Sequence, residues 1–589
     1  MNNNFNFLNI FEFRKLLKIL EAGEKKKLLI LFILMIIASF LEMISIGIII
    51  PLINFLINPD AISNNIFSFI AKYSSNLSNL SYINFVILAI FVIYILKNLF
   101  LFFYTFFYGK ILLELKANIK KRLFQQYLKK DYIFHLNSNS AFLIKNIQME
   151  TSILINNFVS PFLLFCLSSL TTFFILILLF YYSFISSLII LFIFGVSAII
   201  LSFFVKQKIK IIGKERQTHD YEMLKNLQQG LSLIKVIKLF AKEKFFLEKF
   251  NFHNIAMISL GIKRAVFGVL PKIVFELIFI TLSLGSIFYI NSINIPFEKF
   301  LSILLVYALA AYKIIPALSG LSLASQKIRF GLPALELILN QSEKISENSK
   351  NQTNSTNNHF EFNEGIELKD VSFKYSEDQK TILEKINLKI KKNTSIGIVG
   401  DNAAGKSTLV NLICGLIEPE SGKVLVDHKN ISNNVSQWHK LIGFIPQSIY
   451  LTDESVQNNI AIGIEEKNID KEKIKKLIIS TGLSKTLVPE DLVGEDGKNI
   501  SGGQKQKIGI ARALYHEPEI LIYDEPTSAM DSQSEENLTE IVFDQKKSKT
   551  LIIISHKPKV LKHCDLVYEV ANKNVSLIDL KDINLNKTR

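Results

Sequence analysis

The sequence predicts two folds in succession: an α-helical domain that crosses a membrane six times, followed by an α/β domain. Of the 589 residues, 49% are hydrophobic, and the long apolar runs are concentrated between residues 28 and 325. Residues 340–589 instead alternate apolar and polar positions, as a water-facing domain does. Between the two lies 341–359, a stretch of Asn, Ser, Lys and Glu that has almost nothing to bury and is predicted to be a flexible linker.

Six apolar stretches are long enough to be membrane helices. A helix that crosses the ~30 Å hydrocarbon layer needs about 20 mostly apolar residues. The third and fourth stretches are separated by so few residues that only a tight outer turn can join them. The predicted spans are 28–57, 83–108, 158–182, 184–205, 268–290 and 298–320.

The basic residues predict which side of the membrane each connection faces. Connections 109–155 and 206–264 are rich in Lys and Arg, whereas 58–82 has only Lys72 and 291–297 has neither. Because Lys and Arg favour the cytoplasmic side, the N-terminus, both long loops and the C-terminal domain are predicted to lie there. This distribution explains the net charge of +15 without a nucleic acid partner.

The N-terminal segment is predicted to be amphipathic. Residues 5–22 place apolar against polar side chains at near-helical spacing, and Lys25, Lys26 and Lys27 follow before the first span. That pattern suits a helix on the inner membrane surface, and a helix packed on protein is the alternative. The chain's three cysteines are too few and too scattered to predict a disulfide framework or a metal cluster.

A phosphate-binding loop is predicted at 400–408, between an apolar strand at 395–399 and a helix that starts at Lys406. In such loops the backbone N–H groups converge on phosphates, the lysine reaches the β and γ oxygens, and the Ser407 hydroxyl suits Mg²⁺. ATP and Mg²⁺ are therefore the predicted cofactors. The loop residues are Gly400, Asp401, Asn402, Ala403, Ala404, Gly405, Lys406, Ser407 and Thr408.

An apolar run at 520–523 ends in two acids, Asp524 and Glu525. Downstream of a phosphate-binding loop, Asp524 is predicted to hold Mg²⁺ through water, and Glu525 is the predicted catalytic base for the attacking water. The alternative is that the two acids merely form a turn. Together the motifs predict an α/β P-loop nucleotide-binding domain. The predicted domains are 1–27 as the surface helix, 28–335 as the transmembrane domain, 336–362 as the linker and 363–589 as the nucleotide-binding domain.

Residues 366–570 resemble the nucleotide-binding domain of ATP-binding cassette (ABC) ATPases. Besides the loop and the acids, the resemblance is carried by a run that looks like the family's signature: Ser501, Gly502, Gly503 and Gln504. It implies further roles for Tyr375 in stacking on adenine, Gln447 in the Q-loop at Mg²⁺, Asp531 in the D-loop, and His556 as a catalytic switch at the γ-phosphate. In the family the signature meets the γ-phosphate held by a second cassette, so the resemblance implies a homodimer.

Departures from the family pattern are mild. Ile500 and Met530 replace leucines, Lys507 stands where Arg is commoner, and Ala403 and Ala404 replace a Ser/Gly pair. None of these changes removes a charged or catalytic group, so hydrolysis is expected.

The membrane half resembles ABC exporters, in which each long cytoplasmic loop ends in a short coupling helix. The candidates here are 130–135 and 230–235. Three runs are similar to flippases of lipid-linked oligosaccharides from bacterial protein N-glycosylation: 41–47 with Pro51, 271–276, and 311–316. The resemblance implies a location in the bacterial inner membrane, with the nucleotide-binding domain in the cytoplasm.

Lysines inside the predicted spans are the candidate substrate residues. Lys97, Lys272 and Lys313 stand where those flippases tend to have Arg, and cationic groups there suit a pyrophosphate. The alternatives are that Glu276 neutralises Lys272 across one helical turn and that the other lysines extend toward an interface. For the intramembrane Glu42 and Glu276, structural pairing is favoured.

The sequence thus predicts a homodimeric exporter or flippase that hydrolyses ATP to translocate an amphipathic, lipid-linked saccharide. Export of a drug, lipid or peptide is the alternative within transport. A nucleotide-gated channel or regulatory membrane protein is a rival from another class. A soluble ABC ATPase acting on DNA or the ribosome conflicts with the predicted spans.

Overall fold

The computed structural model describes residues 10–48, 79–182, 184–293, 297–349, 361–376, 380–525 and 532–579. The chain forms two compact units. The first comprises Met1–Lys130 and Ser138–Lys350, and the second comprises Asp131–Asn137 and Asn351–Arg589. The predicted domain boundaries stay a prediction, and the short segment 131–137 belongs to the second unit although it lies within the predicted transmembrane domain.

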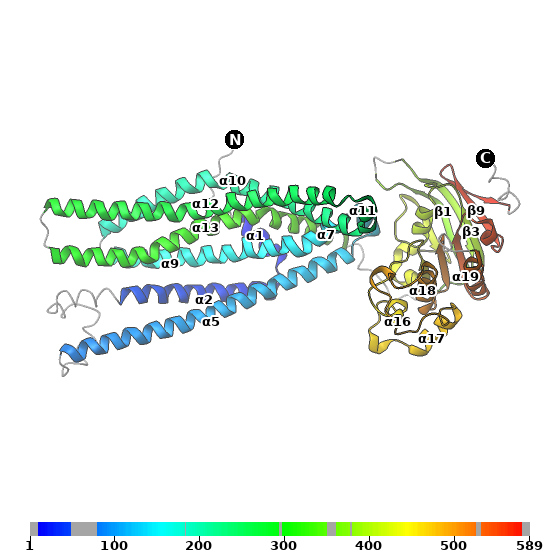
Figure 1. Ribbon diagram of the computed structural model, residues 1–589, viewed down its shortest axis with the longest axis horizontal. Coiled ribbons are helices and arrows are strands. Elements are labelled where there is room, and N and C mark those ends of the chain that lie inside the picture. The colour runs from blue at the N-terminus through cyan, green and yellow to red at the C-terminus, as the bar shows by residue number, and fades with distance from the viewer. Residues whose placement is uncertain are drawn as a thin grey trace. The chain divides into compact units, whose positions relative to one another are not determined.

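The first unit is helical throughout its described residues (Figure 1). Long helices run side by side, and two π-helical turns, η2 and η3, interrupt the segment before α9. The elements are α1 (Ile10–Ile19), α2 (Ala22–Gly47), α5 (Asn79–Leu128), α7 (Ser140–Lys145), η2 (Asn146–Glu150), α8 (Thr151–Leu154), η3 (Ile155–Val159), α9 (Ser160–Tyr182), α10 (Phe184–Ser232), α11 (Ile234–Phe240), α12 (Glu243–Ile293) and α13 (Phe297–Ser349).

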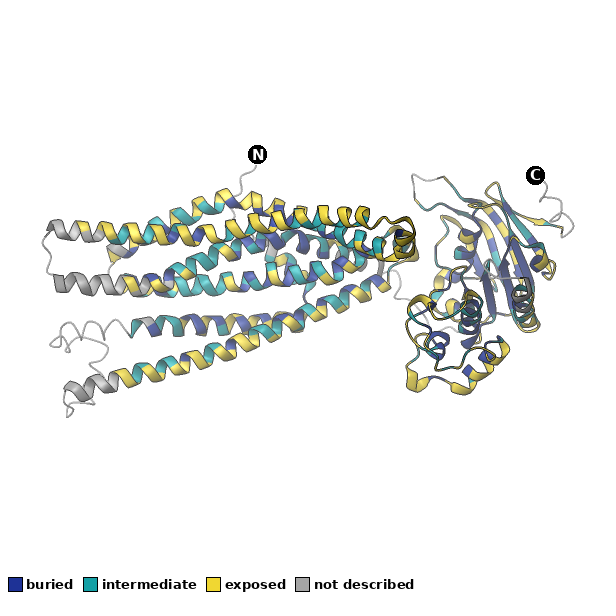
Figure 2. Cartoon of the chain, in the orientation of Figure 1, coloured by how far each residue is buried: buried dark blue, intermediate teal, exposed yellow. Residues whose placement is uncertain are grey.

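Five helical segments within the described residues are long and apolar enough to cross a membrane: Ala22–Ser45, Ile87–Leu128, Ser140–Tyr181, Ser187–Ser232 and Glu243–Gly285. They overlap the first five predicted spans, although 49–57 of the first lies outside the described residues. Many apolar side chains along these helices are exposed, as a lipid-facing surface requires (Figure 2). The sixth predicted span falls on α13, where most side chains from 297 to 310 are not described, and it stays a prediction.

The described part of the amphipathic segment, α1, packs on protein. Leu16 is fully buried, and the ring of Phe13 stacks on that of Phe162 with the centroids 4.2 Å apart. This is the packing expected of the alternative interpretation. A position on the membrane surface stays a prediction for the face of α1 that remains exposed.

The second unit is an α/β fold built on two sheets (Figure 1). A six-stranded sheet has the order β10-β9-β3-β8-β7-β6 and is parallel except for the edge strand β10, and a four-stranded antiparallel sheet has the order β2-β1-β4-β5. The strands are β1 (Gly365–Phe373), β2 (Leu383–Lys391), β3 (Ser395–Val399), β4 (Ser421–Val426), β5 (Lys429–Asn430), β6 (Ile442–Ile445), β7 (Ile520–Asp524), β8 (Thr550–Ile554), β9 (Leu566–Ala571) and β10 (Asn574–Ile578). The helices are α6 (Tyr132–Asn137), α14 (Lys406–Ile413), α15 (Val435–Lys440), α16 (Val456–Ile460), α17 (Lys471–Ser480), α18 (Gly502–Tyr515), α19 (Ser532–Asp544) and α20 (Pro558–Leu561).

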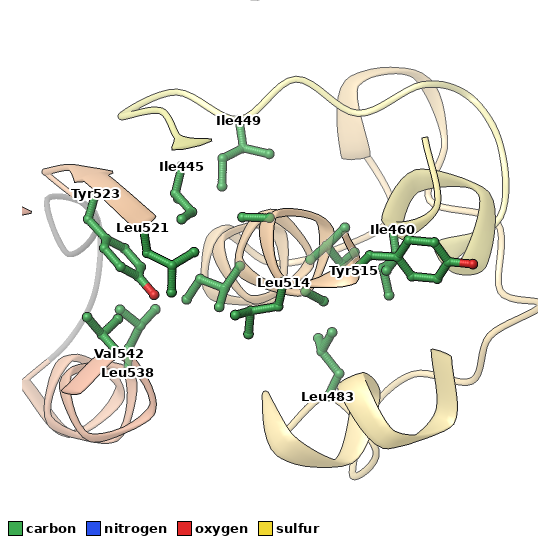
Figure 3. Close-up of a cluster of buried hydrophobic side chains, with 14 of the residues drawn as sticks. Ile445, Ile449, Ile460, Leu483, Leu514, Tyr515, Leu521, Tyr523, Leu538 and Val542 are labelled. Carbon is green, nitrogen blue, oxygen red and sulfur yellow. The ribbon is translucent and has the colours of Figure 1, made fainter. Parts of the chain in front are cut away.

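The parallel strands are buried on both faces, which explains why β7 and β8 read as continuous apolar runs instead of alternating. Figure 3 shows one of the two cores of this unit, in which Leu514 of α18 lies between Leu521 of β7 and Leu483, and Tyr515 lies on the side of Ile460 of α16. The core fixes α18 and the end of β7 together. The predicted fold class, a helical transmembrane domain followed by an α/β P-loop domain, is therefore confirmed.

Candidate functional site

The phosphate-binding loop connects β3 to α14, as predicted. Its glycines are needed because Gly400 and Gly405 have φ of 146° and 108°, a region that side chains disfavour. At Gly400 a Cβ atom would lie 2.3 Å from the carbonyl oxygen of Val570. The turn leaves the first N–H groups of α14 without helical partners, so they are available to phosphate oxygens.

Lys406 is buried and folds back over the loop. Its Nζ donates to the carbonyl oxygens of Gly400, at 2.7 Å, and of Asp401, at 3.0 Å. Burial lowers the pKa of Lys406, and the charges of Glu525, Asp401 and Asp524 act in the opposite direction. The ammonium therefore lies in an acidic pocket and is held by neutral carbonyl groups that a phosphate can replace.

Glu525 joins two other predicted site residues at the carboxyl end of β7. Its Oε2 accepts a hydrogen bond from Nε2 of Gln447 at 2.7 Å, and its Oε1 lies 3.3 Å from Nε2 of His556. Its φ of 47° is unusual for a non-glycine residue, and its own N–H donates to Ile554 of β8. The backbone thus turns sharply to present this carboxylate to both partners.

Asp524 lies one residue earlier and is partly buried. Burial raises its pKa, the neighbouring Glu525 charge raises it further, and Lys406 opposes both. A carboxylate whose ionised form is disfavoured gains from a nearby cation. This is the electrostatic setting expected of a residue that supports Mg²⁺.

Replacing Asp524 with Asn is expected to raise the melting temperature at neutral pH by a few degrees. A raised pKa in the folded state means that the stability associated with protonated Asp524 is present below its unfolded pKa, roughly 3.9, and is lost as pH rises through the folded value. The difference between D524N and the wild type should therefore grow from pH 4 to pH 8. Thermal unfolding of the detergent-solubilised protein without nucleotide measures it.

Asp565 provides a control of opposite sign. Burial acts to raise its pKa, but hydrogen bonds from Lys546 and Ser395 hold the pKa below its ordinary value. Asp565→Asn should therefore lower the melting temperature at neutral pH. Equal shifts in both variants would contradict the electrostatic account of Asp524.

The aromatic and signature residues occupy defined positions. The Tyr375 hydroxyl lies 3.2 Å from that of Thr408 on α14, and the Tyr375 ring packs edge-on against Phe373. Ser501 caps α18 in a capping box: its hydroxyl accepts from the N–H of Gln504, whose side chain accepts from the N–H of Ser501. Asp531 lies outside the described residues.

The candidate substrate lysines differ in their surroundings. Lys97 is 5% exposed, with Nζ 3.7 Å from a carboxylate oxygen of Glu42 and 3.3 Å from the hydroxyl of Ser45. Lys272 is 64% exposed and lies 3.7 Å from Glu276, one turn along α12. The side chain of Lys313 is not described. The structure therefore pairs both intramembrane glutamates with lysines.

A buried charged cluster in the first unit was missed by sequence reasoning. Arg216 donates to Glu150 at 2.9 Å and to Asp220 at 2.8 Å, and Lys145 lies 3.5 Å from Glu150. The spacing of Arg216 and Asp220, four residues apart on one helix, was a signal that could have been used. Nothing in the spacing of Glu150, on η2, pointed to Arg216.

Two protein-family models match the chain. The ABC transporter transmembrane region matches residues 28–312, and the ABC transporter model matches 383–528, so together they match more than two thirds of the chain.

Individual relatives and a solved structure agree with these matches. The ATP-dependent lipid A-core flippase of Ralstonia nicotianae is 24% identical over 472 residues, 79% of this chain and 78% of the relative. A putative export ATP-binding/permease protein of Rickettsia bellii is 30% identical over 373 residues, 61% of this chain and 62% of the relative. The structure of a bacterial Atm1-family ABC exporter with ATP bound superposes with a TM-score of 0.77 at 17% identity, covering 96% of this chain and 97% of that one, which shows a shared fold.

The fold, the phosphate-binding loop and these matches define an ATP-driven membrane transporter. The chain belongs to the ABC transporters, as a half-transporter of the exporter type with one transmembrane region and one cassette. The predicted family and the predicted ATPase class are thereby confirmed.

Proposed function

We propose that two copies of this chain form a flippase of the bacterial inner membrane that hydrolyses ATP to move a lipid-linked saccharide from the cytoplasmic side. The observation that supports ATP hydrolysis is the position of the Glu525 carboxylate between Gln447 and His556. An acceptor held by two polar side chains at the end of a buried strand is suited to orient a water and take its proton.

The oxygen donors near the phosphate-binding loop fit Mg²⁺. A hydroxyl on Ser407, an amide oxygen on Gln447 and the carboxylate of Asp524 are the hard ligands that this ion prefers, and Asp524 is a desolvated carboxylate whose charge it would stabilise. When bound, Mg²⁺ would neutralise phosphate charge. Lys406 binds the phosphates, and Tyr375 stacks on the adenine. Glu525 holds the attacking water, which His556 helps to orient.

The position of the signature on this chain supports the proposed homodimer. Ser501 caps α18 without using the N–H groups of Gly502 and Gly503, and a Cβ at Gly502 would meet no atom within 4 Å. Free N–H groups at a helix start attract a phosphate. A second cassette whose phosphate-binding loop faces this start would complete two identical sites, and the resemblance to the family assigns Asp531 to the D-loop of these sites.

The cargo is proposed from the relatives and the charges. Three of the relatives are named ATP-dependent lipid A-core flippases, which favours a lipid as the class of cargo. Lys272 supports this assignment because its ammonium is exposed on α12 and can exchange Glu276 for a phosphate. Lys97 and Lys313 would add charge, and a drug, another lipid or a peptide is the alternative cargo.

Lipid stimulation of ATP hydrolysis tests the cargo. In nanodiscs, a polyprenyl-pyrophosphate oligosaccharide should raise the ATPase rate several-fold, and Lys272→Gln should weaken the response about tenfold by removing a charge-assisted contact. Lys244→Gln is the matched control, because Lys244 forms the same type of pair with Glu248 on α12 and lies outside the predicted span. Hydrolysis that ignores this lipid but responds to drugs, peptides or lipids that carry no saccharide would overturn the proposed cargo.

A further inference from the structure

A cavity of about 450 Å³ lies within the first unit, and neither Lys97 nor Lys272 lines it. It is bounded by the π-helical turns η2 and η3 with α8 between them, and by α10, α12 and α13. Most of its lining is apolar, including Met149, Ile153, Met257, Leu260 and Phe330. Two guanidinium groups, those of Arg216 and Arg264, also line it.

The two arginines differ in how their charge is compensated. Arg216 belongs to the buried cluster with Lys145, Glu150 and Asp220, in which two positive charges meet two negative ones. Arg264 donates to the amide oxygen of Asn157, a neutral group. Among the described residues, Arg264 has no carboxylate within 4.0 Å, so the cavity carries one uncompensated positive charge.

The guanidinium of Arg264 is held in place against an aromatic face. Its central carbon lies 3.8 Å from the centroid of the Phe330 ring, and that of Arg216 lies 5.5 Å from the same centroid. In addition, Nε of Arg216 is buried with no hydrogen-bond partner among the described residues. The cavity therefore offers donors and positive charge fixed beside an apolar surface.

We propose that this cavity binds an amphipathic organic anion: a phosphate or carboxylate attached to an apolar group, with Arg264 as its charge partner. The anion would compensate Arg264, and the apolar group would cover the methionine and leucine side chains. Arg264 precedes the predicted span 268–290 by four residues, or about 6 Å of helix, which places it near the headgroup layer. A membrane lipid and a water-soluble anion can both reach that depth, and the proposal is independent of the cargo proposed above.

Calorimetric titration of the full-length protein in phosphatidylcholine nanodiscs tests the site. Hexyl phosphate is expected to bind about tenfold or more tightly than either hexanol or inorganic phosphate, because only hexyl phosphate satisfies both the charge and the apolar lining. If inorganic phosphate or hexanol bound as tightly as hexyl phosphate, an amphipathic site would be ruled out.

Two variants locate the binding. Arg264→Gln should weaken hexyl phosphate binding about tenfold, whereas Lys263→Gln, which removes an equal charge from the exposed neighbouring position, should leave it unchanged. Gly261→Leu should also abolish binding with both arginines intact, because Gly261 lines the cavity and a Cβ there meets no atom within 4 Å. Gly109→Leu, on α5 with equally open space, is its control. Equal effects of Arg264→Gln and Lys263→Gln, or full binding by Gly261→Leu, would overturn the proposal.

Partial replacement of phosphatidylcholine by phosphatidylglycerol identifies the source of the anion. Competition with hexyl phosphate, lost in Gly261→Leu, would assign the cavity to an anionic membrane lipid. Undiminished hexyl phosphate binding in those nanodiscs would assign it to a cytoplasmic anion.

Discussion

Replacing Glu525 with Gln should reduce ATP hydrolysis about 10²–10⁴-fold while ATP binding survives. Glutamine keeps the size of the side chain, and its amide oxygen can still accept from Gln447, as the Glu525 carboxylate does at 2.7 Å. It cannot take a proton from water, so the chemical step fails while the binding loop at Lys406 is untouched. Phosphate release and binding of a fluorescent ATP analogue, measured on the same nanodisc sample, separate the two.

Glu519→Gln is the matched control for E525Q. Glu519 lies just before β7 and pairs with Lys392 at 2.8 Å, so its replacement removes an acid at the opposite end of this strand from Glu525 without touching the site. Its ATPase rate should stay within about twofold of the wild type. Retention of most activity by E525Q would show that another group accepts the proton, and a parallel loss of ATP binding would assign Glu525 to binding instead of catalysis.

Replacing Arg216 with Met should destabilise the first unit by about 3–5 kcal/mol, because it leaves buried Asp220 without its cation and buried Glu150 with Lys145 alone. Glu150 is fully buried and Asp220 is 4% exposed. Methionine replaces the aliphatic stem of the arginine side chain but not its guanidinium group, so the loss reports charge more than packing of the stem. Chemical denaturation of the detergent-solubilised protein, monitored by helical circular dichroism, provides the measurement.

Two further variants separate charge from volume at this cluster. Lys225→Met removes a cation from the same helix, α10, but Lys225 and its partner Glu222 are about one third exposed, so a cost below about 1 kcal/mol is expected. Combining R216M with Lys145→Met, Glu150→Gln and Asp220→Asn removes all four buried charges together and should recover much of the stability. If this quadruple variant were no more stable than R216M alone, shape and not charge would account for the loss.

The cassette was the easier half to predict because its chemistry is written in short runs of sequence. The loop 400–408 and the acids after 520–523 each sit beside an apolar strand, and strand order then brings β3 and β7 to either side of β8. These short runs of sequence did not predict the backbone turn at Glu525. The residue has a positive φ, and its N–H donates a hydrogen bond to Ile554 of β8.

The membrane half was predicted as spans but not as packing. Hydropathy locates apolar segments, yet it carries no information about which faces meet, so the contact between Glu150 and Arg216, 66 residues apart, left no local signal. The same holds for Gly331. A Cβ there would lie 2.6 Å from the carbonyl oxygen of Asn157, so the absence of a side chain allows α13 to approach η3. Such close contacts are decided by tertiary structure, and the local sequence around either residue does not reveal them.

The grouping of α6 with the cassette has a practical consequence for protein engineering. Ile133 of α6 packs against the core that holds Trp438 and Ile413, although α6 is tied at both ends to helices of the other unit. The cassette is therefore encoded in two separate stretches of the gene. A chimera in which only residues 351–589 are replaced by those of a relative would leave this chain's own α6 against the relative's core. A chimera that also replaces 131–137 would carry the complete module from the relative.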